Sequence, residues 1–415
     1  MSKTLLVVQP SDDYARRVLD TVPDAVFLAD KQRATELNHH ANVIASDLKD
    51  TEETHRLVTD WMQANKVTLS GITICEAMHE TSALAQSLRL PFHAEELVQR
   101  TRDKFQSSIA WQRENVPTPK TQKVRDLDDL LDFSMQTDGP YILKPSDGSG
   151  SAWVLRVDHA DGLAEAHGRI VAGIGQPTYL IQRLVSGREF SADIFVERGA
   201  IHILRLTEKY LIPAVGRAGM VGAYYPARAT DAMRDALHTA FLRGVMALGI
   251  KRGVVMVDAI WMRGKPYLLE MALRPGGDCL PDLCKYATGY DPIRTACEVA
   301  MGKTPELPNI SRPNPVAALH LITDQSGSIE DINFKNLTQH PVVLHVEPYH
   351  TKGDELRSWE GNYDDSILAS CIVQCARPDD LPGLLEELTK CVDLRVKPIP
   401  KSRQKRVINA ETVTL

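Results

Sequence analysis

Short apolar runs alternate with amphipathic, helix-like segments over the first hundred residues. A polar helix start at Ser11-Asp12-Asp13 follows the first apolar run, and the expected strands cover residues 4–8, 25–28, 41–44 and 67–69. Strands that alternate with helices are typical of a parallel sheet with helices on its faces. Residues 1–100 are therefore predicted to form a small parallel α/β domain.

The pattern changes after Pro117-Thr118-Pro119, where short connections replace the helical segments between most strands. Helices are expected at 161–171 and 231–248, and strands at 141–144, 152–157, 179–184, 189–196, 201–207, 253–261 and 267–271. The last two strands flank the turn Arg263-Gly264 and should form a hairpin. The pattern predicts an α+β module over residues 101–302.

A proline-rich stretch at 303–315, KTPELPNISRPNP, is the clearest linker. Beyond it, a helix is expected at 379–389, with strands at 317–323, 342–347, 370–374 and 394–396. Residues 303–415 are thus predicted to form a C-terminal α+β lobe, and the basic tail to be a solvated extension.

Composition supports an ordinary globular enzyme of two to four domains, at about 100–200 residues per domain. The 415 residues are 43% apolar and 25% charged, and the net charge of −6 with 6% aromatic residues argues against nucleic acid or an anionic membrane surface as a partner. Seven cysteines without a CxxC pair indicate reduced thiols in a cytoplasmic protein. No apolar run of about 20 residues is present, so no membrane span is expected.

Two carboxylates on the expected hairpin are the strongest candidates for chemistry. Asp258 interrupts an apolar strand, and Glu270 ends the strand that should pair with it. Facing carboxylates repel each other unless a cation lies between them, and all-oxygen ligands favour Mg²⁺. Arg274, four residues later, would offer a guanidinium fork to a phosphate or carboxylate. An internal Asp258–Arg274 salt bridge is the alternative.

Two other segments are weaker when taken alone. The Gly- and Ser-rich loop at 147–151 could close its backbone N–H groups over phosphates, although a tight hairpin explains it equally well. Lys144 before it would be costly to bury without an anion, but needs no explanation at a sheet edge. The turn between Gln182 and Glu189 could meet a purine and its ribose, or could be a plain hairpin with surface charges.

In this order and spacing, the three segments resemble the ATP-grasp superfamily. The resemblance covers about residues 101–291 and includes Arg102-Asp103-Lys104 at the entry to the module. The run EMALRPGGDCLPDLCKYATGYDP resembles the L-amino-acid (dipeptide) ligase branch of the carboxylate–amine ligases. The resemblance implies an ATP-grasp fold between an N-terminal parallel α/β domain and a C-terminal α+β lobe.

The resemblance also implies a role for individual residues. Asp258 and Glu270 match the Mg²⁺ ligands, with Mn²⁺ as an alternative ion, and Arg274 matches the catalytic, anion-stabilising arginine. The residues that match ATP-binding positions are Lys104, Lys144, Ser149, Gly150, Ser151, Gln182, Arg183, Val185, Glu189 and Lys209. Among these, the lysines and the Ser-Gly-Ser loop match phosphate contacts, Gln182 and Val185 adenine contacts, and Glu189 the ribose contact.

The implied reaction joins a small-molecule carboxylate to an amine, such as an amino acid, through an acyl phosphate, and releases ADP and phosphate. The implied partners are these substrates, with a homodimer as an option and no nucleic acid or membrane. A carboxylase or purine-pathway type of ATP-grasp ligase is one alternative. A non-catalytic nucleotide-binding module is the other.

Some residues depart from the family pattern or need no chemistry. Ala272 stands where the family commonly has an asparagine ligand, which puts the number of bound metal ions in doubt. Residues 215–226 lack the Glu and His expected to hold an α-ammonium group, which favours an acyl substrate without a free α-amine. His39-His40 is expected at the surface, and Cys279 and Cys284 as small core or pocket residues.

Overall fold

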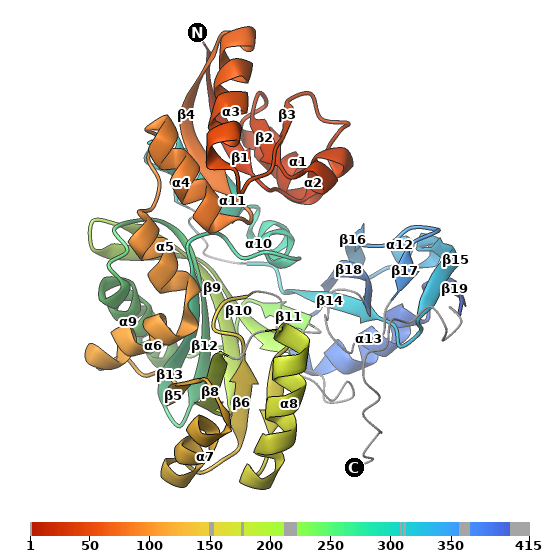
Figure 1. Cartoon of the computed structure of the whole chain (residues 1–415). Coiled ribbons are helices and arrows are strands. Elements are labelled where there is room, and N and C mark those ends of the chain that lie inside the picture. The colour runs from red at the N-terminus through yellow and green to blue at the C-terminus, as the bar shows by residue number, and fades with distance from the viewer. Residues whose placement is uncertain are drawn as a thin grey trace.

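The computed structural model describes residues 2–148, 153–175, 178–210, 222–307, 309, 313–356 and 366–398. Within these ranges the strands form four sheets (Figure 1). None of the helices in these ranges has both the length and the apolar character needed to cross a membrane.

The N-terminal residues form a parallel sheet in the order β3-β2-β1-β4. Its elements are β1 (Ser2–Val8), α1 (Asp12–Thr21), β2 (Val26–Ala29), α2 (Lys31–Glu36), β3 (Val43–Ala45), α3 (Thr51–Asn65), β4 (Val67–Ile74) and α4 (Met78–Leu88). Leu6 and Val8 of β1 pack on the side of α3 and α4, and Leu5 and Val7 on the side of α1. The predicted parallel α/β arrangement is confirmed.

A second, four-stranded sheet has the order β5-β8-β6-β7 and is antiparallel in every pairing. Its strands are β5 (Thr121–Val124), β6 (Tyr141–Lys144), β7 (Leu155–Val157) and β8 (Tyr179–Arg183), with helices α7 (Leu127–Gln136) and α8 (Leu163–Ile174). β5 was not expected from the sequence, because its residues TQKV are mostly polar and it pairs only at the sheet edge.

The central sheet has eight strands in the order β13-β12-β9-β10-β11-β14-β18-β16. They are β9 (Arg188–Glu197), β10 (Ala200–Tyr210), β11 (Gly222–Tyr225), β12 (Arg252–Met262), β13 (Lys265–Ala272), β14 (Val316–Ile322), β16 (Val343–Pro348) and β18 (Ile367–Gln374). The predicted hairpin of β12 and β13 is confirmed. One face of this sheet is buried by α5 (Glu95–Arg102), α6 (Lys104–Arg113) and α9 (Asp231–Leu248) through a core that includes Trp111 and Phe241.

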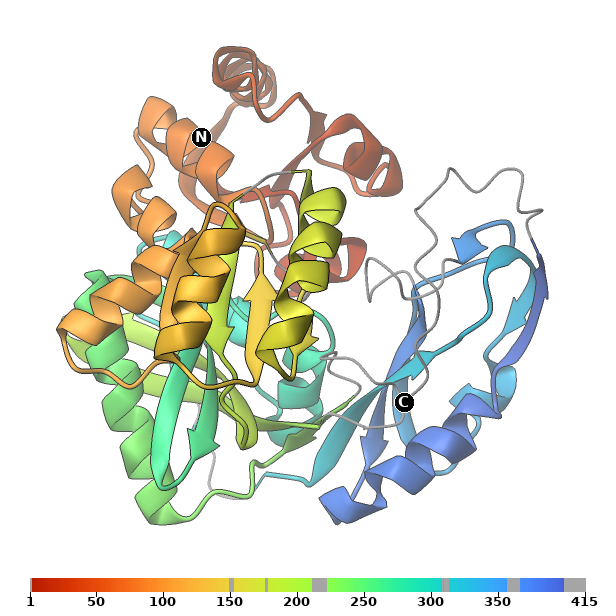
Figure 2. The same cartoon turned by 60° about the horizontal axis from the view of Figure 1, so that its bottom comes forward.

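The C-terminal elements lie to one side of the rest of the chain in both views (Figures 1 and 2). They include a small sheet in the order β17-β15-β19, with strands β15 (Gly327–Asn333), β17 (Glu355–Leu356) and β19 (Asp393–Lys397) and helices α12 (Lys335–Thr338) and α13 (Leu381–Thr389). Strands β14, β16 and β18 continue the central sheet, so this sheet crosses the predicted domain boundary at residue 302. The boundary itself stays a prediction.

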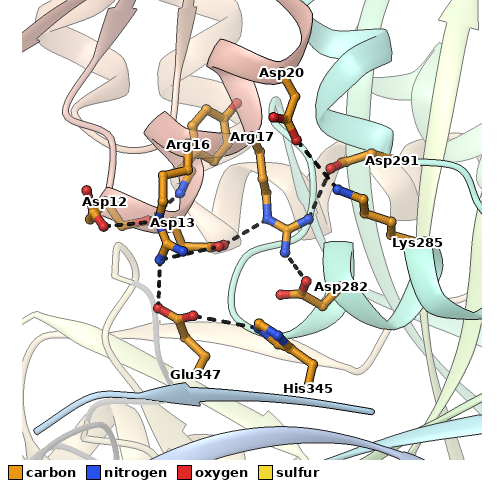
Figure 3. A network of polar contacts seen from close by, with 12 residues as sticks. Asp12, Asp13, Arg16, Arg17, Asp20, Asp282, Lys285, Asp291, His345 and Glu347 are labelled. Carbon is orange, nitrogen blue, oxygen red and sulfur yellow. Dashed lines mark hydrogen bonds and ion pairs between the residues drawn. The ribbon is translucent and has the colours of Figure 1, made fainter. Parts of the chain in front are cut away.

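A polar network joins the N-terminal domain to the later parts of the chain (Figure 3). Helix α10 (Leu280–Thr288) supplies Asp282, and Asp291 caps α11 (Pro292–Ala300). Arg17 of α1 pairs with both carboxylates, at 3.0 Å from Asp291 Oδ2. Arg16, one residue earlier, lies 3.0 Å from Glu347 Oε1 on β16. Helix α1 therefore contacts both the segment after β13 and the C-terminal strands.

Candidate active site

One face of the central sheet is polar where β9, β10, β12 and β13 lie side by side. Glu189, Ser191 and Asp193 of β9 lie on this face, while the residues between them enter the apolar core. The strand register sets Asp258 opposite Ser191 on one side and opposite Glu270 on the other. Directly opposed residues point to the same face of a sheet. The two predicted metal ligands therefore face the same space.

Ion pairs join five of the predicted residues in two groups. Lys209 Nζ lies 2.6 Å from Asp258 Oδ2 and 3.1 Å from Glu189 Oε1. Although burial opposes the change, these two carboxylates raise the pKa of Lys209. Glu270 Oε1 lies 3.4 Å from Lys104 Nζ, which also donates a 2.7 Å hydrogen bond to Gly148 O. Lys104 thus ties the start of α6 to the loop after β6.

Lys144, at the end of β6, lies in the electrostatic reach of the same cluster. Burial and the neighbouring Lys104 ammonium lower the pKa of Lys144 from 10.5 to about 8, against the opposing effect of Glu270, Glu189 and Asp258. Within the described ranges no carboxylate lies within 4.0 Å of its ammonium. An anionic ligand would supply the counter-charge that this lysine lacks.

The carboxylates fit a magnesium ion. Asp258 Oδ2 is held by Lys209, but Asp258 Oδ1 is buried and has no hydrogen-bond partner. A buried carboxylate oxygen without a partner is unfavourable, and a divalent cation would satisfy it. Ala272 follows Glu270 by two residues on β13, so its methyl group faces the same side and adds no ligand oxygen.

The predicted adenine-binding residues lie on and after β8. Gln182 is buried, and its amide nitrogen donates a 2.7 Å hydrogen bond to Thr121 Oγ1 of β5. This bond orients the amide and leaves its oxygen as the acceptor that an adenine amino group needs. Val185 is buried and Arg183 is exposed. Ser149, Gly150 and Ser151 lie outside the described residues.

Arg274 lies on the loop after β13, and its Nη1 donates a 2.9 Å hydrogen bond to Pro275 O. The alternative Asp258–Arg274 salt bridge is not formed, because Lys209 takes the position beside Asp258. Among the described residues no carboxylate lies within 4.0 Å of the Arg274 guanidinium, which keeps its fork open to an anion.

The family model described as an ATP-grasp domain matches residues 101–278. The chain contains an ATP-grasp domain. The predicted superfamily is confirmed, and all the residues of the polar cluster, from Lys104 to Glu270, lie inside the matched ATP-grasp domain.

Two relatives extend this finding. A D-alanine--D-alanine ligase of an Anaeromyxobacter species is 31% identical over 153 residues, which cover 36% of this chain and 49% of that ligase. An uncharacterized protein of Sinorhizobium fredii is 23% identical over 359 residues, 84% of this chain and 73% of that protein. The chain thus spans about half of the ligase that it matches.

Solved structures share the fold over nearly the whole chain. The L-amino acid ligase from Bacillus licheniformis superposes with a TM-score of 0.78 at 19% identity, over 96% of this chain and 99% of that one. The biotin carboxylase domain of 2-oxoglutarate carboxylase from Hydrogenobacter thermophilus, in a complex with MgADP, ADP and bicarbonate, superposes with a TM-score of 0.71 at 14% identity, over 94% and 90%. At these identities the likeness establishes the fold, including the N-terminal and C-terminal parts that flank the ATP-grasp domain.

The sequence did not lead us to expect a buried ion pair in the ATP-grasp domain. Arg205 and Asp193 are both fully buried, with Arg205 Nε 2.7 Å from Asp193 Oδ2. The other oxygen, Asp193 Oδ1, accepts a 2.6 Å hydrogen bond from Gly276 N, two residues after Arg274. A Cβ atom at Gly276 would lie 2.9 Å from Arg205 Nη2 and 3.3 Å from Asp193 Oδ1. The pair therefore fixes the loop that carries Arg274, and glycine is needed for this approach.

The alternation of polar residues along β9 and β10 could have revealed this pair. Arg205, Thr207 and Lys209 recur at every second position of β10, as a polar sheet face requires. Arg205 Nη1 also donates to Thr207 Oγ1 at 2.6 Å and to Ser191 O at 3.2 Å. Polar residues at alternate positions of two neighbouring strands mark one polar face of the sheet.

The cysteines beside the ATP-grasp site are buried, as expected. Burial raises the pKa of both Cys279 and Cys284, which disfavours the thiolate. Cys279 Sγ lies 3.7 Å from His320 Nε2, and His320 Nδ1 lies 2.8 Å from Ser370 Oγ. These contacts link the start of α10 to β14 and β18.

Proposed function

We propose that this protein is an ATP-dependent carboxylate–amine ligase. The observation that carries the proposal is the polar cluster on the central sheet, in which three lysines surround two facing carboxylates. The Lys144 ammonium, which has no carboxylate within 4.0 Å among the described residues, calls for an anion, and Asp258 Oδ1, which has no hydrogen-bond partner, calls for a cation. A magnesium-bound polyphosphate brings both.

Different residues of the site would bind the phosphates, the adenine, the ribose and the metal ion of a bound nucleotide. Lys104, Lys144 and Lys209 would bind the phosphates, and Gln182 Oε1 and the backbone of Val185 would bind adenine. Glu189 would accept hydrogen bonds from the ribose hydroxyls, because a carboxylate whose Oε1 is paired with Lys209 at 3.1 Å keeps further acceptor sites. Asp258 and Glu270 would hold Mg²⁺, which neutralises phosphate charge when bound. Ser149, Gly150 and Ser151 are proposed to cover the phosphates.

The chemistry follows from the poor reactivity of a carboxylate. A carboxylate oxygen forms a bond to the γ-phosphorus of ATP while the bond from that phosphorus to ADP breaks. An amine nitrogen then bonds to the acyl carbon of the acyl phosphate, phosphate leaves, and the amine proton passes to solvent. Arg274 would stabilise the negative charge on the acyl phosphate and on the tetrahedral oxyanion. No side-chain nucleophile is needed.

The acyl substrate is proposed to lack a free α-amine. The stretch 215–226 contains neither Glu nor His, the residue types that would bind an α-ammonium group. Residues 215–221 lie outside the described ranges. The strand that follows them, β11, pairs with β14 and carries the buried residues Tyr224 and Tyr225.

The test is ADP release from pairs of acids and amines, with acids both with and without an α-amine. A ligase requires both substrates and forms an amide that mass spectrometry detects. With an ¹⁸O-labelled carboxylate, one label should appear in the released phosphate, because the carboxylate oxygen bridges carbon and phosphorus in the acyl phosphate. Asp258→Asn should abolish ADP release. Glu330→Gln, which changes an exposed carboxylate on β15, is the control and should leave ADP release unchanged.

Three outcomes would reject the proposal. ADP release that needs bicarbonate and no amine would indicate a carboxylase. ADP release with unlabelled phosphate would mean that water, and not the carboxylate, attacks ATP. Tight ATP binding without turnover for any pair of substrates would indicate a nucleotide-binding module.

A further inference from the structure

Three metal-ligating side chains meet on the N-terminal α/β domain, outside the matched ATP-grasp domain. Asp12 is the first residue of α1, and His39 and His40 lie in the turn after α2. The Nε2 atoms of both histidines lie 2.8 Å from the same oxygen, Asp12 Oδ1. All three ligand atoms lie within 4.8 Å of one another. Both histidines were expected at the surface; His39 lies there, whereas the side chain of His40 is only 8% exposed.

The surroundings hold two of the three side chains in place. His40 is 8% exposed, and its ring packs edge-on against Phe27 of β2 with the ring centroids 5.4 Å apart. Arg16 Nε donates a 3.1 Å hydrogen bond to Asp12 Oδ2, the oxygen that the histidines do not contact. Partners of this kind orient metal ligands and leave the ligating atom free. His39 is 54% exposed, so the cluster is open to solvent on its side.

We propose that Asp12, His39 and His40 bind a divalent transition-metal ion, with Zn²⁺ as the preferred ion. Two imidazoles and one carboxylate are borderline ligands that suit zinc, whereas Mg²⁺ and Ca²⁺ prefer oxygen ligands alone. Three protein ligands leave one tetrahedral position for water on the open side.

The spacing is close to what such an ion needs. Ligand atoms about 2.1 Å from a tetrahedral zinc ion lie about 3.4 Å from one another. The 2.8 Å contacts would therefore widen by about 0.6 Å, which small side-chain rotations supply. His40 Nε2 now donates a hydrogen bond to the carboxylate, and on metal binding the lone pair of each Nε2 would face the ion, with the ring proton on Nδ1.

The site lies on the helix that joins the domains. Arg16 and Arg17, in the turn of α1 that follows Asp12, contact Glu347, Asp282 and Asp291 (Figure 3). A metal ion at the start of α1 would therefore strengthen the attachment of the N-terminal domain to the rest of the chain. Its role is structural, and it does not depend on the ligase reaction.

The experiment uses full-length protein without an affinity tag, because a polyhistidine tag binds the same ions. After treatment with a chelator, the protein is titrated with Zn²⁺ by calorimetry and with Co²⁺ by visible absorption. The expected result is one tight Zn²⁺ ion per chain, with the d–d bands of four-coordinate Co²⁺. Free Zn²⁺ at 100 times its Kd should raise the Tm by about 3 °C, scaled from a 415-residue two-state unfolding.

Variants separate this site from other zinc ligands. His39→Ala should weaken binding at least tenfold, and the double change with His40→Ala should remove both the ion and the Tm rise. His238→Ala, an exposed histidine on α9, should change neither. Asp258→Asn should keep the zinc ion, because that carboxylate belongs to the ATP-grasp cluster.

The opposite results would overturn the proposal. Parent protein that binds no more Zn²⁺ than the double variant would show that the three side chains form only a hydrogen-bonded cluster. Loss of the tight ion in Asp258→Asn, with retention in the double variant, would assign zinc to the ATP-grasp carboxylates instead.

Discussion

Replacement of Lys144 by methionine should stabilise the unliganded protein and weaken ATP binding. Burial and the nearby Lys104 lower the pKa of Lys144 from 10.5 to about 8, so the folded protein holds this proton less tightly than the unfolded chain. Methionine keeps an unbranched apolar stem and removes the charge. The change should therefore relieve a penalty in the empty site and remove a ligand from the occupied one.

The magnitude follows from the pKa. The fall from 10.5 to about 8 corresponds to about 3 kcal/mol. At pH 7 the lysine is protonated in both states, so the penalty acts in full, and Lys144→Met should raise the free energy of unfolding by up to about 3 kcal/mol. Between about pH 8 and 10.5 the parent gains stability as its folded lysine deprotonates first, so the advantage of the variant should shrink to nothing.

ATP binding supplies the missing counter-charge and should raise the Lys144 pKa again. The parent should take up a proton on binding near pH 8, and its ATP affinity should fall about tenfold between pH 7 and pH 9. Lys144→Met should bind ATP weakly, with little dependence on pH over this range. Calorimetry in two buffers of different ionisation enthalpy measures the proton uptake, and urea unfolding measures stability.

Lys251→Met, an exposed lysine before β12, is the matched control and should change neither property. The reasoning would be refuted if Lys144→Met destabilised the empty protein at pH 7 and bound ATP as tightly as the parent. Lys144 would then serve as a counter-ion for the carboxylates, and not as a phosphate ligand.

Four further predictions concern the same site. Glu270→Gln should reduce turnover at least a hundredfold, even at saturating Mg²⁺, because the amide loses a charged metal ligand; activity within a few-fold of the parent would make the carboxylate structural. Ala272→Asn should lower the Mg²⁺ concentration that gives half-maximal ADP release, because it adds a ligand oxygen. An unchanged Mg²⁺ titration would mean that a water molecule already fills this ligand position. Arg274→Lys keeps the charge but loses the fork, so rapid-quench kinetics should show a kcat lower by two to three decades, about 2–4 kcal/mol, with nearly normal ATP affinity. Gly276→Ala should displace the Arg274 loop and lower kcat about tenfold or more, while Gly168→Ala, whose Cβ meets nothing within 4 Å, should be neutral; equal kcat values for the two would remove the positioning role of Asp193 and Arg205.

The sequence alone was enough for features that depend on local geometry. The hairpin of β12 and β13 follows from two strands and one tight turn, although a bulge between Asp258 and Ala259, which the sequence did not predict, sets Asp258 opposite Glu270. The start of α1 after Ser11 follows from a capping residue and an apolar pattern. The order of lysines, glycine-rich loop and paired carboxylates was likewise sufficient to predict the ATP-grasp superfamily.

The tertiary structure decided which distant residues meet. The partner of Asp258 is Lys209, 49 residues away, and not the nearer Arg274, because β9 lies between β10 and β12 and aligns their polar faces. Asp193 accepts a hydrogen bond from Gly276, which is 83 residues later in the chain. Asp12 at the start of α1 contacts His39 and His40, which lie in the turn after α2. Contacts of this kind depend on how whole strands and helices pack against one another, and the spacing of residues along the chain carries no information about that packing.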